Sequence, residues 1–417
     1  MASTSSAAGA AAAPTPPAAA SPEMGERIRR AWHEETLLLP LRDADHARRL
    51  PGQSKHSRLA GLGGPAQVEL LGTGETFAAW RLSAEDGTAL LVRIPWHTPA
   101  HPLADELAAL TQLPPGVGPE PLALHDDAES SPLGAPYLVT TPVPGRILVP
   151  PRWSRGHLMA HADRLAQLHR VATPGRGPVS LGADPWGRME PVRLSLLELF
   201  EADTESVDGA VLARIGGPGV LRSAARRLRE ADAAFAGLEG FVLSHGDLCA
   251  TNIVWDAQVP RFIDFEWAMG DDPARDLAII GGAVHGGPWY VPLTEEDIEA
   301  FVGSYLHARA RLDGASELPR LEGQAPPLPA PTLDAAGLRA RRDAWEIYEK
   351  TAMLLHVAGR VTDRGDADRG GADRSGAAHD GADGTADAPA PTAAAHGPYA
   401  TALPILRDTL RARLGAD

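Results

Sequence analysis

The hydrophobic pattern divides the chain into a part that predicts strands and a part that predicts helices. Between residues 66 and 145, apolar and polar residues alternate in AQVELLGTGETFAAWRL, and GTALLVRIPW is a short apolar run preceded by the turn signal Asp86–Gly87. The leucines of LADELAALTQL have helical spacing, so one helix is predicted among these strands. The stretch YLVTTPVPG at 137–145 predicts another strand, which ends at proline and glycine.

From about residue 151 the periodicity becomes helical. The stretches GHLMAHADRLAQLHRV and GVLRSAARRLREADAAFAGL carry an apolar residue at every third or fourth position. Strands therefore come first and helices follow, which predicts an α+β protein with a β-rich first part and a helical second part. We place the boundary after residue 145, between an N-terminal lobe at 23–145 and a helical lobe at 146–417.

Two segments of biased composition fall outside this pattern. Residues 1–22 are mostly alanine, serine and proline, and residues 363–397 are rich in aspartate, glycine and alanine. Side chains this small or polar bury too little apolar surface to offset the entropy of ordering the chain. We therefore expect a disordered tail at 1–22 and a disordered insert at 363–397.

Charge and cysteine content narrow the class of protein. The net charge of −15 argues against nucleic-acid binding, because basic residues are not in excess, and it suits cationic partners or simple solubility. Cys249 is the single cysteine, so no internal disulfide can form, which fits a cytoplasmic location. No apolar run approaches the length of a membrane span, and no membrane partner is expected.

The stretch SHGDLCATNIVWD at 244–256 carries the chemistry of the chain. Asp247 and Asn252 lie between two short apolar runs, and Asp264 follows the next run, PRFID. Tight connections between short strands keep these three side chains within several ångströms of one another. An amide and a carboxylate suit a hard cation such as Mg²⁺ with the phosphates it neutralises, and the other carboxylate can serve a substrate hydroxyl.

The spacing His245-Gly246-Asp247-x₄-Asn252, with Asp264 in IDFEWA, resembles the catalytic loop of the aminoglycoside phosphotransferase and choline kinase family. These proteins are small-molecule phosphotransferases that resemble protein kinases. GDDPARDLA at 270–278 and LAQLHRV at 165–171 resemble further segments of the family. The resemblance covers roughly residues 66–310.

The resemblance implies a protein-kinase-like bilobal α+β fold and transfer of the γ-phosphoryl group of ATP to an alcohol group of a small molecule. It assigns Asp247 to the proton of the acceptor hydroxyl, and Asn252 and Asp264 to Mg²⁺. It assigns Asp276 to bracing the catalytic loop through hydrogen bonds. Glu266, taken to lie on the same strand face as Asp264, is open between a second Mg²⁺ and a capping role.

His245 has two interpretations, a proton carrier and an organiser of the loop, and we favour the organising role.

In the first lobe, LLGTGETFAAWRL resembles the glycine-rich hairpin that covers nucleotide phosphates. Gly72 and Gly74 would let backbone N–H groups approach them. Arg93 stands where protein kinases place a lysine, and Glu106 is its natural ion-pair partner. Asp105, next to Glu106, is the competing partner. The backbone of residues 137–145 would act as the hinge that binds adenine.

The acceptor site is the least defined part of the sequence. Trp289, Tyr290, Trp345 and Glu346 could form an acidic, aromatic pocket for a cationic acceptor. The simpler interpretation is structural, since Thr294 with Asp297 has the form of a capping box.

Among acceptors we place an aminoglycoside-like antibiotic ahead of choline, ethanolamine or another metabolite. A nucleotide-binding pseudoenzyme is the second hypothesis. A protein kinase is disfavoured because no A-P-E segment follows Asp264. The sequence makes no prediction of the oligomeric state.

Overall fold

The alternating residues of the first part form one antiparallel sheet. The computed structural model describes residues 18–38, 63–238, 240–314, 328, 333–361 and 398–415. The sheet has the strand order β1-β2-β3-β5-β4, and each neighbouring pair is antiparallel. Its strands are β1 (Ala66–Thr73), β2 (Phe77–Ala84), β3 (Ala89–Pro95), β4 (Pro121–His125) and β5 (Tyr137–Thr140).

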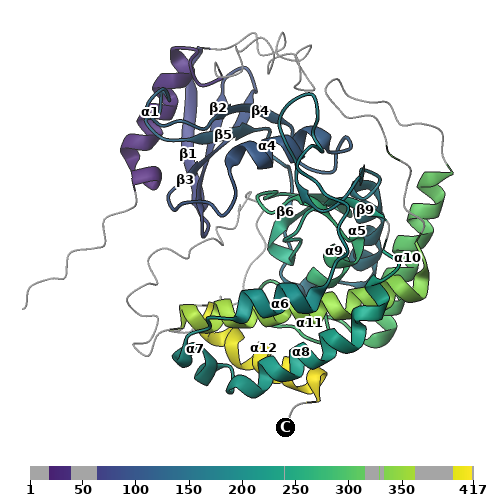
Figure 1. The fold of residues 1–417 in the computed structure, drawn as a ribbon. Coiled ribbons are helices and arrows are strands. Elements are labelled where there is room, and N and C mark those ends of the chain that lie inside the picture. Colours follow the sequence, from purple (N-terminus) through teal and green to yellow (C-terminus); the bar gives the residue numbers. More distant parts are fainter. Residues whose placement is uncertain are drawn as a thin grey trace, which may run out of the picture.

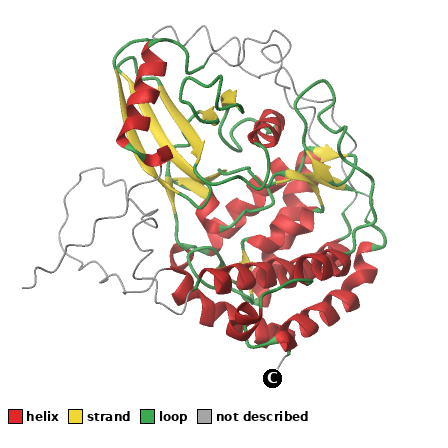
Figure 2. Cartoon of the chain, turned by 60° about the vertical axis from the view of Figure 1, so that its left-hand side comes forward, coloured by secondary structure: helices red, strands yellow, loops and turns green. Residues whose placement is uncertain are grey.

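The two faces of this sheet bury different partners, because successive side chains of a strand point to opposite sides. Helix α1 (Pro22–His33) lies across one face, where Ile28 and Trp32 pack in one apolar cluster with Trp80 and Val92 (Figure 2). Helix α4 (Leu103–Gln112) lies on the other face and shares a core cluster with Leu138 of β5 and with the second lobe. The sheet therefore separates an outer helix from the interior of the molecule.

The start of the described chain corrects the expected tail. Ala18–Ala20 form a short 3₁₀ helix, and Ala19 and Ala20 are buried. The indole Nε1 of Trp80 donates a hydrogen bond to the carbonyl oxygen of Ala19 at 2.8 Å, and Ser21 caps α1. The expectation of a tail through residue 22 is wrong for residues 18–22, because the large Trp80 ring supplies the apolar surface that these small side chains lack. The rest of the predicted tail, and the predicted insert at 363–397, lie outside the described residues.

The second lobe is mostly helical, as predicted, and lies below the sheet in Figure 1. Its long helices pack in pairs, α10 on α5 and α11 on α9 and α12. The helices are α5 (Arg155–Leu168), α6 (Leu196–Thr204), α7 (Gly209–Arg214), α8 (Pro218–Ala231), α9 (Pro273–Ile279), α10 (Glu295–Asp313), α11 (Ala335–Arg360) and α12 (Pro398–Leu414), with 3₁₀ turns η3 (Pro150–Arg152), η4 (Asp232–Phe235) and η5 (Ala250–Asn252).

Short strands of the second lobe hold the loops of the SHGD region. One small sheet has the order β7-β9-β12-β8, another has the order β11-β10-β6, and β13 pairs with β14. The strands are β6 (Arg146–Ile147), β7 (Ala172–Thr173), β8 (Gly177–Pro178), β9 (Phe241–Ser244), β10 (Ile253–Asp256), β11 (Val259–Phe262), β12 (Met269–Asp271), β13 (Gly281–Gly282) and β14 (Val291–Pro292).

The link between the lobes passes from β5 to β6. Gly145 has φ of +126°, and a Cβ atom there would lie 2.4 Å from the carbonyl oxygen of Trp255. A glycine is required at this close approach, because any side chain would meet the backbone of β10. The β-rich first lobe and the mostly helical second lobe agree with the predicted bilobal α+β fold. Among the described helices, none is long and apolar enough to cross a membrane.

Candidate active site

The catalytic-loop motif forms a sharp turn directly after β9. Gly246 has φ of +81°, and a Cβ atom there would lie 2.4 Å from the carbonyl oxygen of Trp267. The backbone N–H groups of His245 and Gly246 both donate to the carboxylate of Asp276, at 2.7 and 2.9 Å. The turn is therefore held by one buried carboxylate on α9, as the sequence predicted for Asp276.

Asp276 is ionised within this network. Burial alone would raise its pKa, but the hydrogen bond from His169 and the nearby charges of His169 and His245 outweigh burial and hold it well below the usual range. His169 lies 3.1 Å from Asp276, and the His245 Nε2 atom lies 2.9 Å from the carbonyl oxygen of Ile263. His245 thus links the loop to the backbone after β11, a geometry that favours the organising role.

Asp247 and Asn252 face each other across the loop. The Nδ2 group of Asn252 donates to the Asp247 backbone carbonyl at 2.8 Å and to its Oδ2 atom at 2.9 Å. Burial, together with the charges of Asp264 and Glu349, raises the pKa of Asp247 to about 7, although Asn252 and Arg275 oppose this shift. The carboxylate of Asp247 therefore lies in a crowded acidic environment.

Asp264 joins this group through the backbone. The N–H of Ile263 donates to the carbonyl oxygen of Asn252 at 3.0 Å, and Asp264 follows with a left-handed φ of +68°. Such a conformation is uncommon for a residue with a side chain. The structure therefore brings together Asp247, Asn252 and Asp264 as predicted from the sequence.

Arg93 connects the two lobes at this point. Its guanidinium forms ion pairs with Glu106 on α4 and with Asp264, and it lies over the Phe77 ring at 4.3 Å. Of the two acids weighed from the sequence, Glu106 is the partner of Arg93, whereas Asp105 pairs with Arg188 at 2.5 Å. Burial raises the pKa of Glu106 to about 7 even though the charge of Arg93 opposes that shift. The contact between Arg93 and Asp264 was not predicted.

Glu266 does not lie on a strand, so the expected strand-face relation to Asp264 is wrong. The chain turns after Asp264, and Glu266 begins that turn. Burial and the charge of Asp264 together raise the pKa of Glu266 to about 8. The two carboxylates are therefore close enough to interact even though no strand aligns them.

The oxygen atoms at this site can hold a hard divalent cation only if Asn252 takes part. Among the described residues, no three His, Cys, Asp or Glu side chains form a metal site by themselves. The Nδ2 group of Asn252 is turned to Asp247, which leaves its amide oxygen available. Arg93 takes one carboxylate oxygen of Asp264, and the second oxygen has no hydrogen bond within the described chain. Oxygen ligands of this kind suit Mg²⁺.

The glycine-rich hairpin connects β1 and β2 next to Arg93. The pairing register shifts between Leu70 and Gly72, and the N–H of Gly74 donates to the carbonyl oxygen of Phe77 at 2.8 Å. A Cβ atom at Gly72 would meet nothing within 4 Å, and one at Gly74 would lie 3.7 Å from Phe77. The fold itself does not require either glycine, so the predicted role in approaching phosphate stays a prediction.

Two charged side chains of α11, which no motif of the sequence singles out, lie near the catalytic loop. The carboxylate of Glu349 pairs with the Nε group of Arg275 at 2.7 Å, and Arg275 also pairs with Asp271 at 3.1 Å. The ammonium group of Lys350 is buried over the Tyr290 ring at 3.2 Å. These residues come about 100 positions after the motif and carry no pattern of their own.

The acidic, aromatic pocket considered from the sequence does not form as expected. Trp345 and Glu346 are fully buried, and Tyr290 is nearly so. The Trp345 indole donates to Asp272 at 3.1 Å, and Glu346 pairs with Arg342 at 2.8 Å, so both have structural partners. The alternative that residues 294–297 begin a helix is confirmed, since Thr294 and Asp297 form a capping box at the start of α10.

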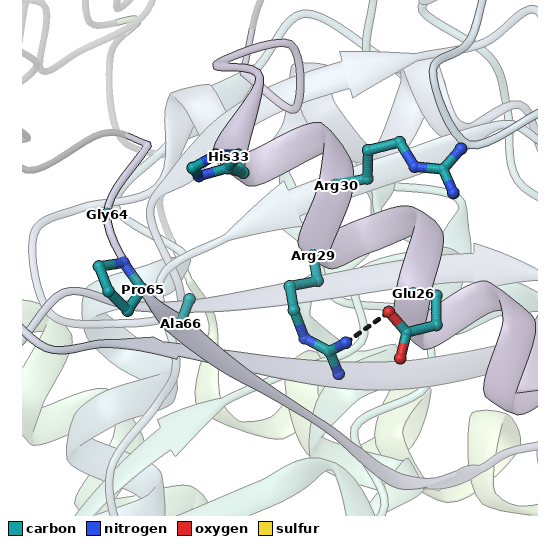
Figure 3. A pocket seen from close by; sticks show the side chains of 7 residues that line it. All are labelled: Glu26, Arg29, Arg30, His33, Gly64, Pro65 and Ala66. Carbon is teal, nitrogen blue, oxygen red and sulfur yellow. Dashed lines mark hydrogen bonds and ion pairs between the residues drawn. The ribbon is translucent and has the colours of Figure 1, made fainter.

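A separate hollow lies on the outer side of the first lobe, between α1 and the start of β1 (Figure 3). It has a volume of about 360 Å³. The Arg29 side chain pairs with Glu26 at 2.5 Å, and His33 contacts the carbonyl oxygen of Gly63 at 2.7 Å. None of the predicted site residues lines it. Its lining consists of Glu26, Arg29, Arg30, His33, Gly64, Pro65 and Ala66.

The chain resembles solved structures of low sequence identity. A candidate aminoglycoside phosphotransferase from Ralstonia eutropha JMP134 is 13% identical, with a TM-score of 0.50 over 88% of this chain and 98% of that one. A candidate fructosamine-3-kinase from Thermobifida fusca is 19% identical, with a TM-score of 0.44 over 86% and 98%. A thermostable mutant of an aminoglycoside phosphotransferase in complex with ADP and hygromycin B is 16% identical, with a TM-score of 0.46 over 73% and 90%.

Comparison with protein sequences gives the family. No curated protein matches the chain. Residues 67–347 match the model of the phosphotransferase enzyme family, which extends from the first strand of the sheet into α11. That match covers well over half of the 417 residues. The chain therefore belongs to the phosphotransferase enzyme family and is a small-molecule phosphotransferase.

Proposed function

We propose that the protein transfers the γ-phosphoryl group of ATP, in the presence of Mg²⁺, to an alcohol group of a small molecule. The observation that carries this proposal is the meeting of Asp247, Asn252, Asp264 and Arg93 at the junction of the two lobes. Phosphoryl transfer depends mainly on positioning and on neutralising charge, and these residues supply a carboxylate, an amide oxygen and a guanidinium for that purpose.

Asp247 is the residue that we assign to the acceptor hydroxyl. Its backbone carbonyl and one carboxylate oxygen are fixed by Asn252, and Asp276 fixes the turn that precedes it. A carboxylate held in this way can accept the hydroxyl proton once the acceptor lies within hydrogen-bond reach. Because a buried network sets its position, little reorganisation is needed when the acceptor binds.

Asn252 and Asp264 would hold Mg²⁺, which when bound neutralises phosphate oxygens. The backbone bond between Ile263 and Asn252 keeps these two ligands together. Arg93 would hold phosphate oxygens from the other lobe, with Glu106 fixing the direction of its guanidinium. Gly72 and Gly74 would cover the phosphates from above, where no side chain fills the space.

For the acceptor we propose an amino sugar of the aminoglycoside type ahead of choline or ethanolamine. The charges of Asp264 and Glu349 act on Asp247, and the charge of Asp247 acts on Glu266, so the place where the hydroxyl would lie is acidic. An acidic site favours a cationic acceptor, in line with the net charge of −15.

The test is an assay of ADP release with a panel of amino sugars, nucleoside antibiotics, macrolides and amino alcohols, with and without Mg²⁺. We expect Mg²⁺-dependent turnover with at least one amino sugar, and its loss in Asp247→Asn while ATP binding, measured by calorimetry, persists. Asp256→Asn is the matched control, because Asp256 is an exposed aspartate at the end of β10. ATP binding without turnover of any acceptor would instead support a pseudoenzyme.

A further inference from the structure

The tip of the glycine-rich hairpin contacts the second lobe. Glu75 lies between β1 and β2, and its Oε1 atom forms an ion pair with Arg360 at the end of α11. The Nε2 atom of His356, one helical turn earlier, lies 3.3 Å from the same Glu75 oxygen. One carboxylate of the first lobe is therefore held by two basic side chains of the second lobe.

This contact lies close to the proposed catalytic base. The charge of Asp247 acts on His356, where it opposes the lowering of the His356 pKa by burial. The His356 ring also lies 5.9 Å from the ring of Tyr399 on α12. The contact thus joins the hairpin to a part of α11 that lies near Asp247.

The charge of Glu75 has a consequence for nucleotide binding. A hairpin that covers a triphosphate with a bare carboxylate at its tip would repel the phosphates. Arg360 offsets that charge, and Arg360 and His356 together hold the tip toward the second lobe. The same pair of contacts therefore acts on both the position and the charge of the hairpin.

We propose that Glu75, His356 and Arg360 form an interlobe clasp that holds the glycine-rich hairpin over the phosphates, so that all three are positioning residues for phosphoryl transfer. The proposal rests on the proposed function, because it places the phosphates under the hairpin. The three side chains are between 38% and 46% exposed, so solvent weakens the attraction. Exposed pairs of this kind change an equilibrium by a factor of about two to five.

The test compares Glu75→Gln, Arg360→Gln and the double variant in MgATP affinity and in amide hydrogen exchange of residues 66–84 without nucleotide. We expect Arg360→Gln to weaken MgATP binding about three- to fivefold and to speed exchange at the hairpin tip. The double variant should bind MgATP more tightly than Arg360→Gln, because it removes the uncompensated carboxylate. Glu85→Gln is the matched control, since this exposed glutamate lies at the far end of the same hairpin.

Each outcome decides the proposal. Unchanged exchange and unchanged affinity in Arg360→Gln would overturn it, and so would a double variant that binds more weakly than Arg360→Gln. If the unmodified protein does not bind MgATP, the proposed function fails, and the clasp loses its role toward phosphate even if hairpin exchange responds. Faster exchange and weaker binding in Arg360→Gln, with recovery in the double variant, support both.

Discussion

His161 on α5 is a buried histidine whose ring has no polar partner. It is fully buried, and neither ring nitrogen has a hydrogen bond within the described residues. The ring stacks on Phe301 of α10 at 5.5 Å and meets Phe262 edge-on at 5.5 Å. The site holds an aromatic ring among aromatic neighbours and gives a charged ring no hydrogen bond, so we predict that His161→Phe makes the helical lobe more resistant to acid.

The magnitude follows from the difference in pKa between the folded and unfolded chain. Burial lowers the pKa of His161 to about 3 in the folded protein, against an unfolded value of about 6.5. The folded state therefore keeps the ring neutral. The contribution of this neutral ring to the stability of the protein is fully present above pH 6.5 and is lost as the pH falls toward 3, because the unfolded chain takes up the proton first. At pH 5 the unfolded chain gains about 2 kcal/mol by protonating this ring, which is 1.5 units at about 1.4 kcal/mol each.

The assay is urea unfolding followed by circular dichroism between pH 7.5 and pH 5.0. We expect His161→Phe to lose about 2 kcal/mol less stability over this range than the unmodified protein, and to be at least as stable at pH 7.5, because two unpaired nitrogens are removed. His307→Gln is the control, since His307 is an exposed histidine on α10. Equal pH dependence in His161→Phe and the unmodified protein would refute the argument.

Three other substitutions test the turn, the link and the interlobe arginine. Gly145→Ala should destabilise the protein by about 2 kcal/mol or more, because its Cβ atom would lie 2.4 Å from Trp255, whereas Gly209→Ala, which meets nothing within 4 Å, should not lower the thermal midpoint. Asp276→Asn should lower the free energy of unfolding by about 3 kcal/mol and abolish turnover, because the two backbone N–H groups bond to different carboxylate oxygens and an amide keeps only one oxygen. A retained kcat would contradict the bracing role. Arg93→Lys should weaken ATP binding, measured by calorimetry, about tenfold, because a single ammonium group cannot hold two carboxylates and phosphate. An unchanged affinity would remove Arg93 from the nucleotide site.

The sequence by itself determined the features that depend on neighbours along the chain. Alternation in 66–95 identified the strands and the two faces of the sheet, because side-chain direction in a strand has a period of two. The glycine directly before Asp247 identified the turn, because Gly246 adopts a backbone conformation that few other residues can. The capping box at Thr294 and Asp297 was predictable for the same reason, since all of its atoms lie within one helical turn.

Tertiary structure alone decided which distant side chains meet. Glu106 and Asp105 are adjacent on one helix, and only the angle at which α4 packs selects Glu106 for Arg93. Glu349 and His356 reach the surroundings of Asp247 because α11 packs beside α9, and nothing local in the sequence of α11 encodes that approach. Local patterns record the geometry of a single element, whereas the partner of a charged side chain depends on how separate elements pack, which the whole hydrophobic core determines at once.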